Sequence, residues 1–454
     1  MSGDASDPRI GFRTTCFSLV VCQHPETGKF LAVQERETGW WLPGGQVRRG
    51  KTFLTMAHLK AQEEAGMQVD ITGILSVEHT LLGPPGKQEE ARMRVVFFAH
   101  PFDPNAQPKT AADGASLRAA WKTLDELNSL AAVPGSEGLR GRELLEWGKY
   151  IESGGEVYPV EVLQEEHDGP CCALRIWNTP ASVNGGCKML CPISRMSRRG
   201  LDTRSKEQFL PILLRTPSLS PTVLQKALLE IFGKQCQGTT VEELARLYTD
   251  ALYDQLALSG GATCSAAPVT HQASDASPRV DFDTHGFSVV VCQHPETGKF
   301  LAVDESKNRG WWLPAGHVDR GQTFLEAAER ETEEEAGLLV DITGILAVEH
   351  SIKGREGRQQ DARMRIIFFA RPKDTGAPPK SVPDSESNGA AWTTTADLEQ
   401  LARLRPPQGL RGRELLKWGQ YVEQGRPVFP AHLLQTERAG PSKERWAALE
   451  AGRG

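Results

Sequence analysis

The sequence predicts an α+β fold, an α/β/α sandwich, present in two tandem copies. Three observations support this. The sequence contains an internal repeat, since VCQHPETGKFLAV occurs from Val21 and again from Val291, and WWLP, VDITGIL, ARMR and LRGRELL also recur. Within each copy, short β-branched and aromatic runs are mixed with segments of helical periodicity. At 454 residues the chain is also too long for one ordinary core.

Each copy contains the same series of expected elements. In the second copy, FSVVVCQ and KFLAV are expected strands separated by HPETG, which favours a hairpin. Pro and Gly in WWLPAG favour an irregular loop before a helix. VDITGILAVEH and ARMRIIFFARP follow as strands, and a terminal helix is expected around LRGRELLKWGQYVEQG. Several antiparallel strands combined with two helices indicate the sandwich.

The repeat sets the expected domain boundaries. We expect one domain over residues 10–165, a second over residues 281–436, and a tail over residues 437–454. Residues 166–280 have no counterpart in the repeat. Their two amphipathic stretches, SPTVLQKALLEIFGKQ and TTVEELARLYTDALYDQLALSG, predict a partly helical insert that ends in a Ser-, Ala- and Thr-rich linker.

Composition excludes several functional classes. The formal net charge of -6 gives no basic excess, so dedicated nucleic-acid binding is not expected. No apolar run approaches the roughly 18 residues that cross a bilayer, and the first residues lack a signal pattern. We therefore expect a cytoplasmic protein with reduced thiols. Four cysteines offer a zinc site as an alternative, although their spacing is not the paired C-x2-C form: Cys171, Cys172, Cys187 and Cys191.

One short segment of the second copy is unusually acidic. Residues 326–335 contain six glutamates. On a helix, Glu331, Glu334 and Glu335 share one face, while Glu329 and Glu333 project from the opposite side. Their mutual repulsion would be removed by a divalent cation, and Mg²⁺ takes such carboxylate oxygens together with waters and phosphates. The alternative is an ordinary solvated helix face.

The spacing around these glutamates resembles the Nudix box, whose family pattern is G-x5-E-x7-R-E-U-x-E-E-x-G-U, with U a bulky apolar residue. Here the pattern falls on Gly316, Gln322, Arg330, Glu331, Thr332, Glu334, Glu335, Gly337 and Leu338. The resemblance covers both copies. It implies a Nudix fold in which Glu331, Glu334 and Glu335 carry catalytic Mg²⁺, with Mn²⁺ as an alternative, and Arg330 orients them.

The two boxes depart from the family pattern to different degrees. In the second copy, Gln322 replaces the first glutamate and Thr332 replaces an apolar residue. In the first copy, the pattern keeps Gly45, Glu63, Glu64 and Gly66, but the first glutamate, the arginine and a metal-binding glutamate are replaced by Lys51, Leu59 and Lys60. An ammonium donates where Mg²⁺ needs acceptors, so we expect the first copy to be inactive.

The resemblance implies hydrolysis of a nucleoside diphosphate linked to another group, by metal-activated water. Glu386 is the candidate loop base, with an exposed loop acid as the alternative. The stretches ILAVEH, ARMRIIFFARP and DSESNGAAW are similar to animal Nudix hydrolases that cleave 8-oxo-guanine nucleoside diphosphates. We expect Gly316, Trp312 and Arg365 to contact the substrate, although Trp312 could serve packing and Arg365 could face solvent.

Two hypotheses follow from the whole sequence. The first is a Mg²⁺-dependent hydrolase of nucleotide-like small molecules, in which the two copies pack as an intramolecular pseudo-dimer with one active site. The second is a non-catalytic scaffold that uses two Nudix folds to bind nucleotides or proteins. Gln322 and the altered first box favour the second hypothesis, whereas Arg330 and the three glutamates favour the first.

Overall fold

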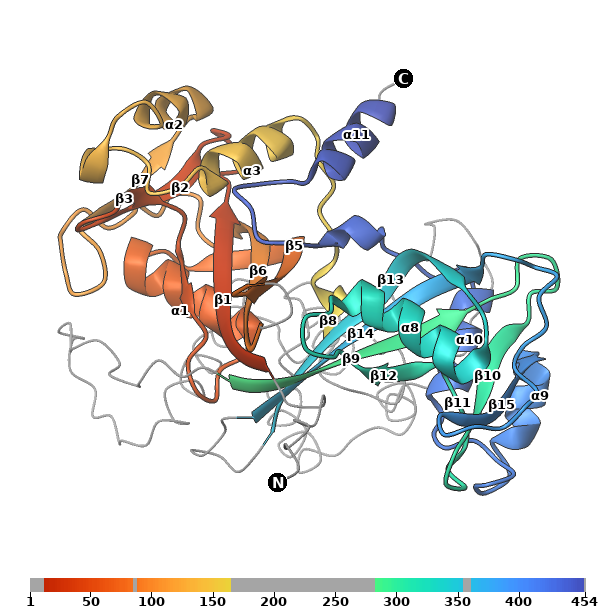
Figure 1. Ribbon diagram of the computed structural model, residues 1–454. Coiled ribbons are helices and arrows are strands. Elements are labelled where there is room, and N and C mark those ends of the chain that lie inside the picture. The colour runs from red at the N-terminus through yellow and green to blue at the C-terminus, as the bar shows by residue number, and fades with distance from the viewer. Residues whose placement is uncertain (1–11, 85–87, 165–281, 354–360, 453–454) are drawn as a thin grey trace, which may run out of the picture. The chain divides into compact units, whose positions relative to one another are not determined.

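The computed structural model describes residues 12–84, 88–164, 282–353 and 361–452. Residues 12–164 are called the first copy, residues 282–435 the second copy, and residues 436–452 the C-terminal segment. The expected insert over residues 166–280, with its four candidate zinc ligands, lies outside the described residues. Figure 1 shows the arrangement of the elements.

The two copies contain matching elements in the same order. The first copy consists of β1 (Phe12–Cys22), β2 (Phe30–Glu35), β3 (Gly39–Trp41), β4 (Gly44–Gln46), α1 (Phe53–Ala65), β5 (Val69–Leu82), β6 (Glu90–Pro101), β7 (Arg118–Lys122), α2 (Leu124–Leu130), α3 (Glu143–Glu152) and β8 (Leu163–Gln164). The second copy consists of β9 (Phe282–Cys292), β10 (Phe300–Glu305), β11 (Gly310–Trp312), β12 (Ala315–His317), α8 (Phe324–Ala336), β13 (Val340–Lys353), β14 (Asp361–Pro372), β15 (Ser387–Thr393), α9 (Thr395–Leu401), α10 (Glu414–Glu423) and β16 (Leu434–Gln435). The C-terminal segment adds α11 (Lys443–Ala451).

These elements form the predicted α+β sandwich in each copy. In the second copy, α8 contacts β9 and β12 of a large mixed sheet on one side and β10 and β15 of a small antiparallel sheet on the other. The helix α10 packs against β9 and α9. The same layers recur in the first copy around α1 and α3. The predicted fold class is confirmed, and the conserved order of elements places both helices α1 and α8 between two sheets.

The predicted hairpin is only partly formed. Its two strands are present as β9 and β10, and HPETG connects them as expected. They share an isolated bridge between Gln293 and Phe300, after which β10 pairs with β11 and β15 in the small sheet. The turn therefore carries the chain from one layer of the sandwich to the next.

Short strands connect the two copies. Within the described residues, ten strands form one sheet in which β1 pairs antiparallel with β9. The last strand of each copy pairs with the other copy, since Leu163 of β8 lies opposite Val348 and Leu434 of β16 lies opposite Val77. Each copy thus completes the sheet of the other.

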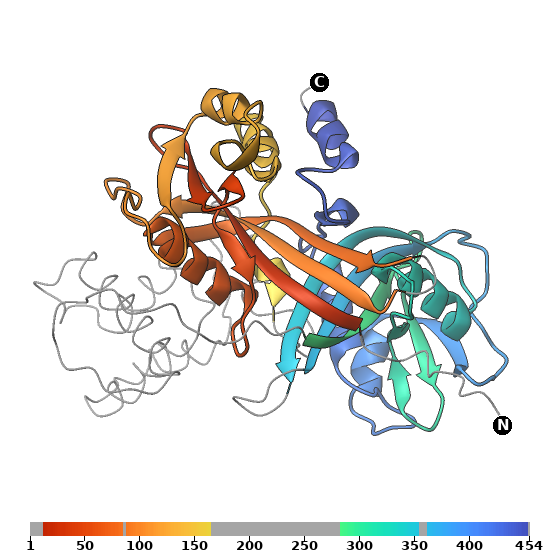
Figure 2. The ribbon, with the colours of Figure 1, turned by 60° about the vertical axis from the view of Figure 1, so that its left-hand side comes forward.

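The C-terminal segment packs on the first copy. The side chain of Arg445 is fully buried, donates to the carbonyl oxygens of Leu75 and Glu156, and stacks against the rings of Trp147 and Tyr150. The views of Figures 1 and 2 both place α11 beside α3. The core of the first copy is therefore partly closed by residues from the far end of the chain. None of the described helices is both long enough and apolar enough to cross a membrane.

Candidate active site

The acidic helix α8 is fixed at both ends by its own sequence. At its start, the Thr323 hydroxyl accepts from the Glu326 backbone N–H, and the Glu326 carboxylate accepts from the Thr323 N–H, which is a capping box. At its end, Gly337 adopts φ 67° and closes the helix in the left-handed conformation that favours glycine. The register of its glutamates is therefore well defined.

Two of the three predicted metal ligands are buried and one is exposed. Glu331 and Glu335 each have 9% of their surface exposed. The side chain of Glu334 is 43% exposed. Glu329 and Glu333 are exposed, as expected for the opposite face. The acidic run is therefore more than a solvated face, because two carboxylates are turned into the protein.

Glu331 fits against the glycine at the start of the box. A Cβ added to Gly316 would lie 1.9 Å from both Cδ and Oε1 of Glu331, so the carboxylate could not keep this position beside any larger residue. Gly316 is therefore needed because the carboxylate occupies the space where its side chain would be. Burial raises the pKa of Glu331 to about 7, and the nearby charge of Glu334 adds to this while Arg330 opposes it.

Glu335 is held beside this position by backbone contacts. Its carboxylate accepts from the Ala315 N–H at 3.0 Å. The Ser387 hydroxyl donates to the Glu335 carbonyl oxygen at 2.6 Å, which connects the helix to β15. The pKa of Glu335 is raised to about 8, mainly by burial and in part by the charges of Glu331, Glu305 and Glu386, while the hydrogen bond from Ala315 opposes the rise. Three other carboxylates thus act on Glu335.

Arg330 neutralises part of this charge. Its guanidinium contacts Glu331 at 2.9 Å and Glu334 at 2.8 Å, and it donates to the His317 carbonyl oxygen at 2.9 Å. The Gln322 side-chain oxygen accepts from Arg330 Nε at 3.2 Å. Gln322 therefore holds the arginine through its amide, so the missing carboxylate at this position is replaced by a neutral acceptor.

The donor set is suited to a hard cation, although the side chains do not form a finished site. In the part of the chain that the structure describes, no three His, Cys, Asp or Glu side chains are grouped as metal ligands. Arg330 lies between Glu331 and Glu334 instead. Buried carboxylates with raised pKa values are groups that a divalent cation would stabilise in the ionised form.

The equivalent site of the first copy is filled by a lysine. Lys60 Nζ lies 3.2 Å from Glu63 and 3.1 Å from Glu64, and Arg48 forms a two-point contact with Glu63 at 2.8 and 3.0 Å. Glu64 accepts from the Gly44 N–H at 3.0 Å, as Glu335 does from Ala315. Both acids of the first box are therefore already neutralised by side chains of the same copy.

The charge difference between the copies extends beyond the box glutamates. Five equivalent positions carry four acids and one base in the second copy, namely Asp319, Arg330, Glu331, Glu334 and Glu335. In the first copy, the same positions carry two acids and two bases, namely Arg48, Leu59, Lys60, Glu63 and Glu64. The exchange of Asp319 for Arg48 was not singled out from the sequence, because the box pattern leaves that position unspecified.

Two predicted substrate contacts lie in the protein interior. Trp312 is 7% exposed and its Nε1 donates to Glu414 at 2.9 Å. Arg365 is 4% exposed and forms ion pairs with Glu349 and Glu414. An equivalent group around Arg94 is present in the first copy. Because the arrangement is shared by both copies, it favours packing for Trp312 and an internal ion pair for Arg365 over contact with a ligand.

Two acids outside the helix act electrostatically on Glu335. Glu386, the predicted loop base, is exposed in the loop before β15 and lies near enough to raise the pKa of Glu335. Glu305, at the end of β10, is 6% exposed and pairs with Arg411. Sequence reasoning missed Glu305, since a single acid at the end of a strand carries no spacing signal.

Comparison with known proteins agrees with this geometry. The family model described as NUDIX domain matches residues 15–147 and 284–418. The chain belongs to the NUDIX family. The resemblance inferred from the box is thereby confirmed for both copies, and the family match covers the helices α1 and α8 with the sheets on either side of them.

Individual relatives match only part of this NUDIX chain. The 8-oxo-dGDP phosphatase NUDT18 of Mus musculus is 34% identical over 124 residues, 27% of this chain and 33% of the relative. The phosphatase NudJ of Escherichia coli K12 is 29% identical over 120 residues, 26% of this chain and 74% of the relative. A NUDIX hydrolase structure from Nitrosomonas europaea has 22% identity and a TM-score of 0.26, and covers 34% of this chain and 97% of that chain. The chain spans about a third of the length of the first curated relatives it matches.

Proposed function

We propose that the second copy hydrolyses a phosphoanhydride bond in a nucleoside diphosphate derivative with the help of a divalent cation, Mg²⁺ or Mn²⁺, and that the first copy is inactive. One observation carries the proposal. Glu331 and Glu335 are two buried acids of the second copy, whereas in the first copy Lys60 stands in place of Glu331 and pairs with both remaining acids, Glu63 and Glu64. The excess negative charge in the second copy would be balanced by a bound cation, whereas the acids of the first copy are already balanced by Lys60.

Each residue of the second copy's site would have its own role in the reaction. Glu331, Glu334 and Glu335 would hold the cation, which when bound would lower the pKa of water and screen phosphate charge. Arg330 would set the orientation of the first two carboxylates, because its guanidinium contacts both. Glu386 is our candidate for accepting the proton of the attacking water, since its charge acts on Glu335.

The substrate class follows from the relatives. Two relatives named 8-oxo-dGDP phosphatase are each more than 30% identical to this chain over their matched regions. We therefore propose oxidised guanine nucleoside diphosphates as the first substrates to test. Gly316 would line this site through its contact with Glu331, while Trp312 and Arg365 would support it from the interior.

The two copies would act as an intramolecular pseudo-dimer. The pairing of β1 with β9 and the exchange of β8 and β16 support this proposal. We also propose the domain limits given by the repeat, residues 10–165 and 281–436, with the two terminal strands crossing between the domains. The inactive copy would then serve as the structural partner of the active one.

A pair of matched variants tests the proposed function. Glu335→Gln and Glu64→Gln remove the same charge from equivalent positions, each of which accepts a backbone N–H at 3.0 Å. With the full chain, Mg²⁺ and a panel that includes 8-oxo-dGDP and dGDP, we expect Glu335→Gln to lower kcat more than about 100-fold, since even indirect metal partners contribute 10- to 100-fold. Glu64→Gln should match wild type.

The possible results separate the hypotheses. A loss of hydrolytic activity in Glu64→Gln but not in Glu335→Gln would place the activity in the first copy. If wild type turns over no nucleotide of the panel, the hydrolase proposal fails and the scaffold hypothesis takes its place. Circular dichroism of each variant controls for unfolding.

A further inference from the structure

The two copies exchange a matching aromatic contact at the start of their box helices. Phe324, the first residue of α8, meets the ring of His79 from β5 of the first copy, with centroids 4.9 Å apart and planes at 80°. Phe53, the first residue of α1, meets His350 from β13 of the second copy, at 4.9 Å and 71°. Each box helix is therefore bordered at its start by a histidine of the other copy.

We propose that His79 is a positioning residue for the metal-binding helix of the second copy, although it belongs to the first copy. This inference rests on the proposed function, because it assigns His79 to the helix that would hold the cation. It gives the inactive copy a defined task, which is to fix the place of α8.

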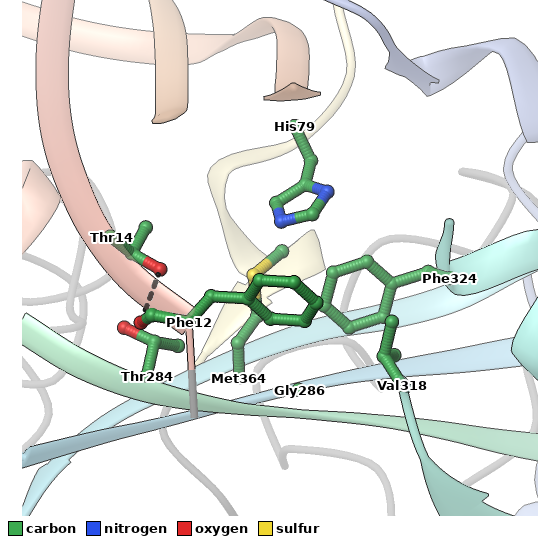
Figure 3. A pocket seen from close by; sticks show the side chains of 8 residues that line it. All are labelled: Phe12, Thr14, His79, Thr284, Gly286, Val318, Phe324 and Met364. Atoms are coloured by element: carbon green, nitrogen blue, oxygen red, sulfur yellow. Dashed lines mark hydrogen bonds between the residues drawn. The ribbon is translucent and has the colours of Figure 1, made fainter. Parts of the chain in front are cut away.

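The surroundings of Phe324 leave its ring little freedom. Figure 3 shows His79 and Phe12 of the first copy facing Phe324, with Gly286 and Val318 on the other side. The cavity among these residues measures about 10 Å³, which is room for one water at most. A Cβ at Gly286 would lie 3.2 Å from Phe324 Cζ, so the packing is close there as well. His79 therefore forms one wall of a space that the phenylalanine ring fills.

The position of Phe324 is linked to the position of the carboxylates. Glu331 follows Phe324 by seven residues, which is close to two helical turns, so both lie on the same face of α8. Both side chains are buried, and the Phe324 carbonyl oxygen accepts from the Ser288 hydroxyl at 2.6 Å. A helix is stiff over this length. A shift or rotation at Phe324 would therefore displace Glu331 from its place against Gly316.

A second contact crosses between the copies near the box but is weaker. Arg320, in the loop before α8, pairs with Glu89 of the first copy at 2.9 Å. The side chains are 31% and 67% exposed, and pairs of this kind contribute little in water. The buried aromatic contact is therefore the one that we expect to position the helix.

The test uses His79→Ala with His350→Ala as the matched control, both in the full chain. Each variant removes the same side chain from equivalent positions of the interface, but the ring of His79 contacts the first residue of α8, whereas the ring of His350 contacts the first residue of α1. We expect His79→Ala to lower kcat and to raise the Mg²⁺ concentration for half-maximal activity by about 10-fold, the lower range for residues that orient metal ligands. The KM for the nucleotide should stay unchanged. Mn²⁺ binding, measured by calorimetry without substrate, should weaken by the same factor.

The control should behave differently although His350 belongs to the copy that we propose to be active. We expect His350→Ala to keep kcat and Mn²⁺ affinity within about twofold of wild type, even if its unfolding temperature falls. His79→Phe should restore both quantities, because the role requires a packed ring and no imidazole chemistry.

Three results would overturn the inference. Unchanged Mn²⁺ affinity and kcat in His79→Ala would show that α8 needs no support from the first copy. Equal losses in both variants would indicate general destabilisation of the interface. Loss in His350→Ala alone would overturn the proposed function too, since the working helix would then be α1, whereas the first two results leave the proposed function intact.

Discussion

Lys60 of the first copy lies where Glu331 lies in the second, each against a glycine that has no room for a side chain. A Cβ at Gly45 would lie 2.4 Å from Lys60 Cε, and a Cβ at Gly316 would lie 1.9 Å from Glu331 Cδ. The same position beside the glycine backbone is thus occupied by a lysine side chain in one copy and by a glutamate carboxylate in the other. One position of the helix decides whether the site repels or attracts a cation.

Substitution of Gly316 by alanine should abolish this arrangement in the second copy. The added methyl group would overlap the Glu331 carboxylate, so that either the carboxylate or β12 must move. We expect Mn²⁺ affinity and kcat to fall by at least about 10-fold, as for other losses of ligand orientation. Calorimetry and nucleotide hydrolysis measure these effects.

The matched control is Gly45→Ala. There the clash falls on the flexible end of Lys60, which can change rotamer. We expect activity equal to wild type and a small loss of stability. A loss of activity comparable with that of Gly316→Ala would contradict the assignment of the two sites.

Replacement of Lys60 by glutamate should make the first copy dependent on metal. The new carboxylate at position 60 would lie beside those of Glu63 and Glu64. Arg48, which pairs with Glu63, would remain as the nearby positive charge. Unfolding of Lys60→Glu, measured in the Glu335→Gln background with and without Mg²⁺, should show a lower unfolding temperature that Mg²⁺ restores. Equal curves with and without Mg²⁺ would show that the first copy cannot be converted by charge alone.

Arg445 should contribute strongly to the stability of the first copy. It is fully buried, and Arg445→Met would leave the carbonyl oxygens of Leu75 and Glu156 without this donor. Each buried polar group that loses its partner costs about 1–3 kcal/mol, so we expect a loss of about 2–5 kcal/mol in urea unfolding. The exposed Lys443 on the same helix provides the control, and Lys443→Met should change stability by less than about 0.5 kcal/mol. Similar values for both variants would contradict the packing of α11 on the first copy.

The buried His350 should make the protein less stable in mild acid. Burial lowers the pKa of His350 from 6.5 to about 4. As the pH falls below 6.5, the unfolded state takes up a proton before the folded state does, so this contribution to stability is present above pH 6.5 and is lost towards pH 4. At pH 5 the loss should reach about 2 kcal/mol, at 1.36 kcal/mol per pH unit.

The variant His350→Leu isolates this effect, since leucine cannot take up a proton. Urea unfolding at pH 7.5 and pH 5.0 should show that wild type loses more stability than the variant between the two conditions. Parallel losses would mean that His350 does not titrate differently in the folded state.

The sequence predicted the parts of this molecule that depend on local pattern. The box spacing located α8 and the position of Gly337, and helical periodicity separated Glu331 and Glu335 from Glu329 and Glu333 on the opposite face. The replacement of a metal-binding acid by Lys60 was also visible, and its contact with Glu63 and Glu64 follows directly from helix geometry.

Features that depend on contacts far apart in the chain escaped sequence analysis. The strands β8 and β16 contain two residues each, too few for any periodicity to show that they cross between the copies. His79 and His350 look like ordinary strand residues, and only the pairing of the copies brings them to Phe324 and Phe53. Trp312 was a candidate substrate contact with packing as the alternative, and only the fold shows that Glu414, 102 residues later, accepts from its buried ring nitrogen.

The exchange of the terminal strands has a consequence for any attempt to study one half alone. Separating the copies would open the sheet edges at β5 and β1 in the first copy and at β13 and β9 in the second, and would leave each fragment with an unpaired Leu-Gln strand. The two strands, Leu163–Gln164 and Leu434–Gln435, have the same sequence. A fragment of residues 281–454 carries both the vacant edge on β13 and a strand that matches it. Two identical fragments can pair these edges by exchanging the strand, so the separated half should form a homodimer. In the intact chain the covalent link holds the two copies together, whereas the fragments would have to associate from solution.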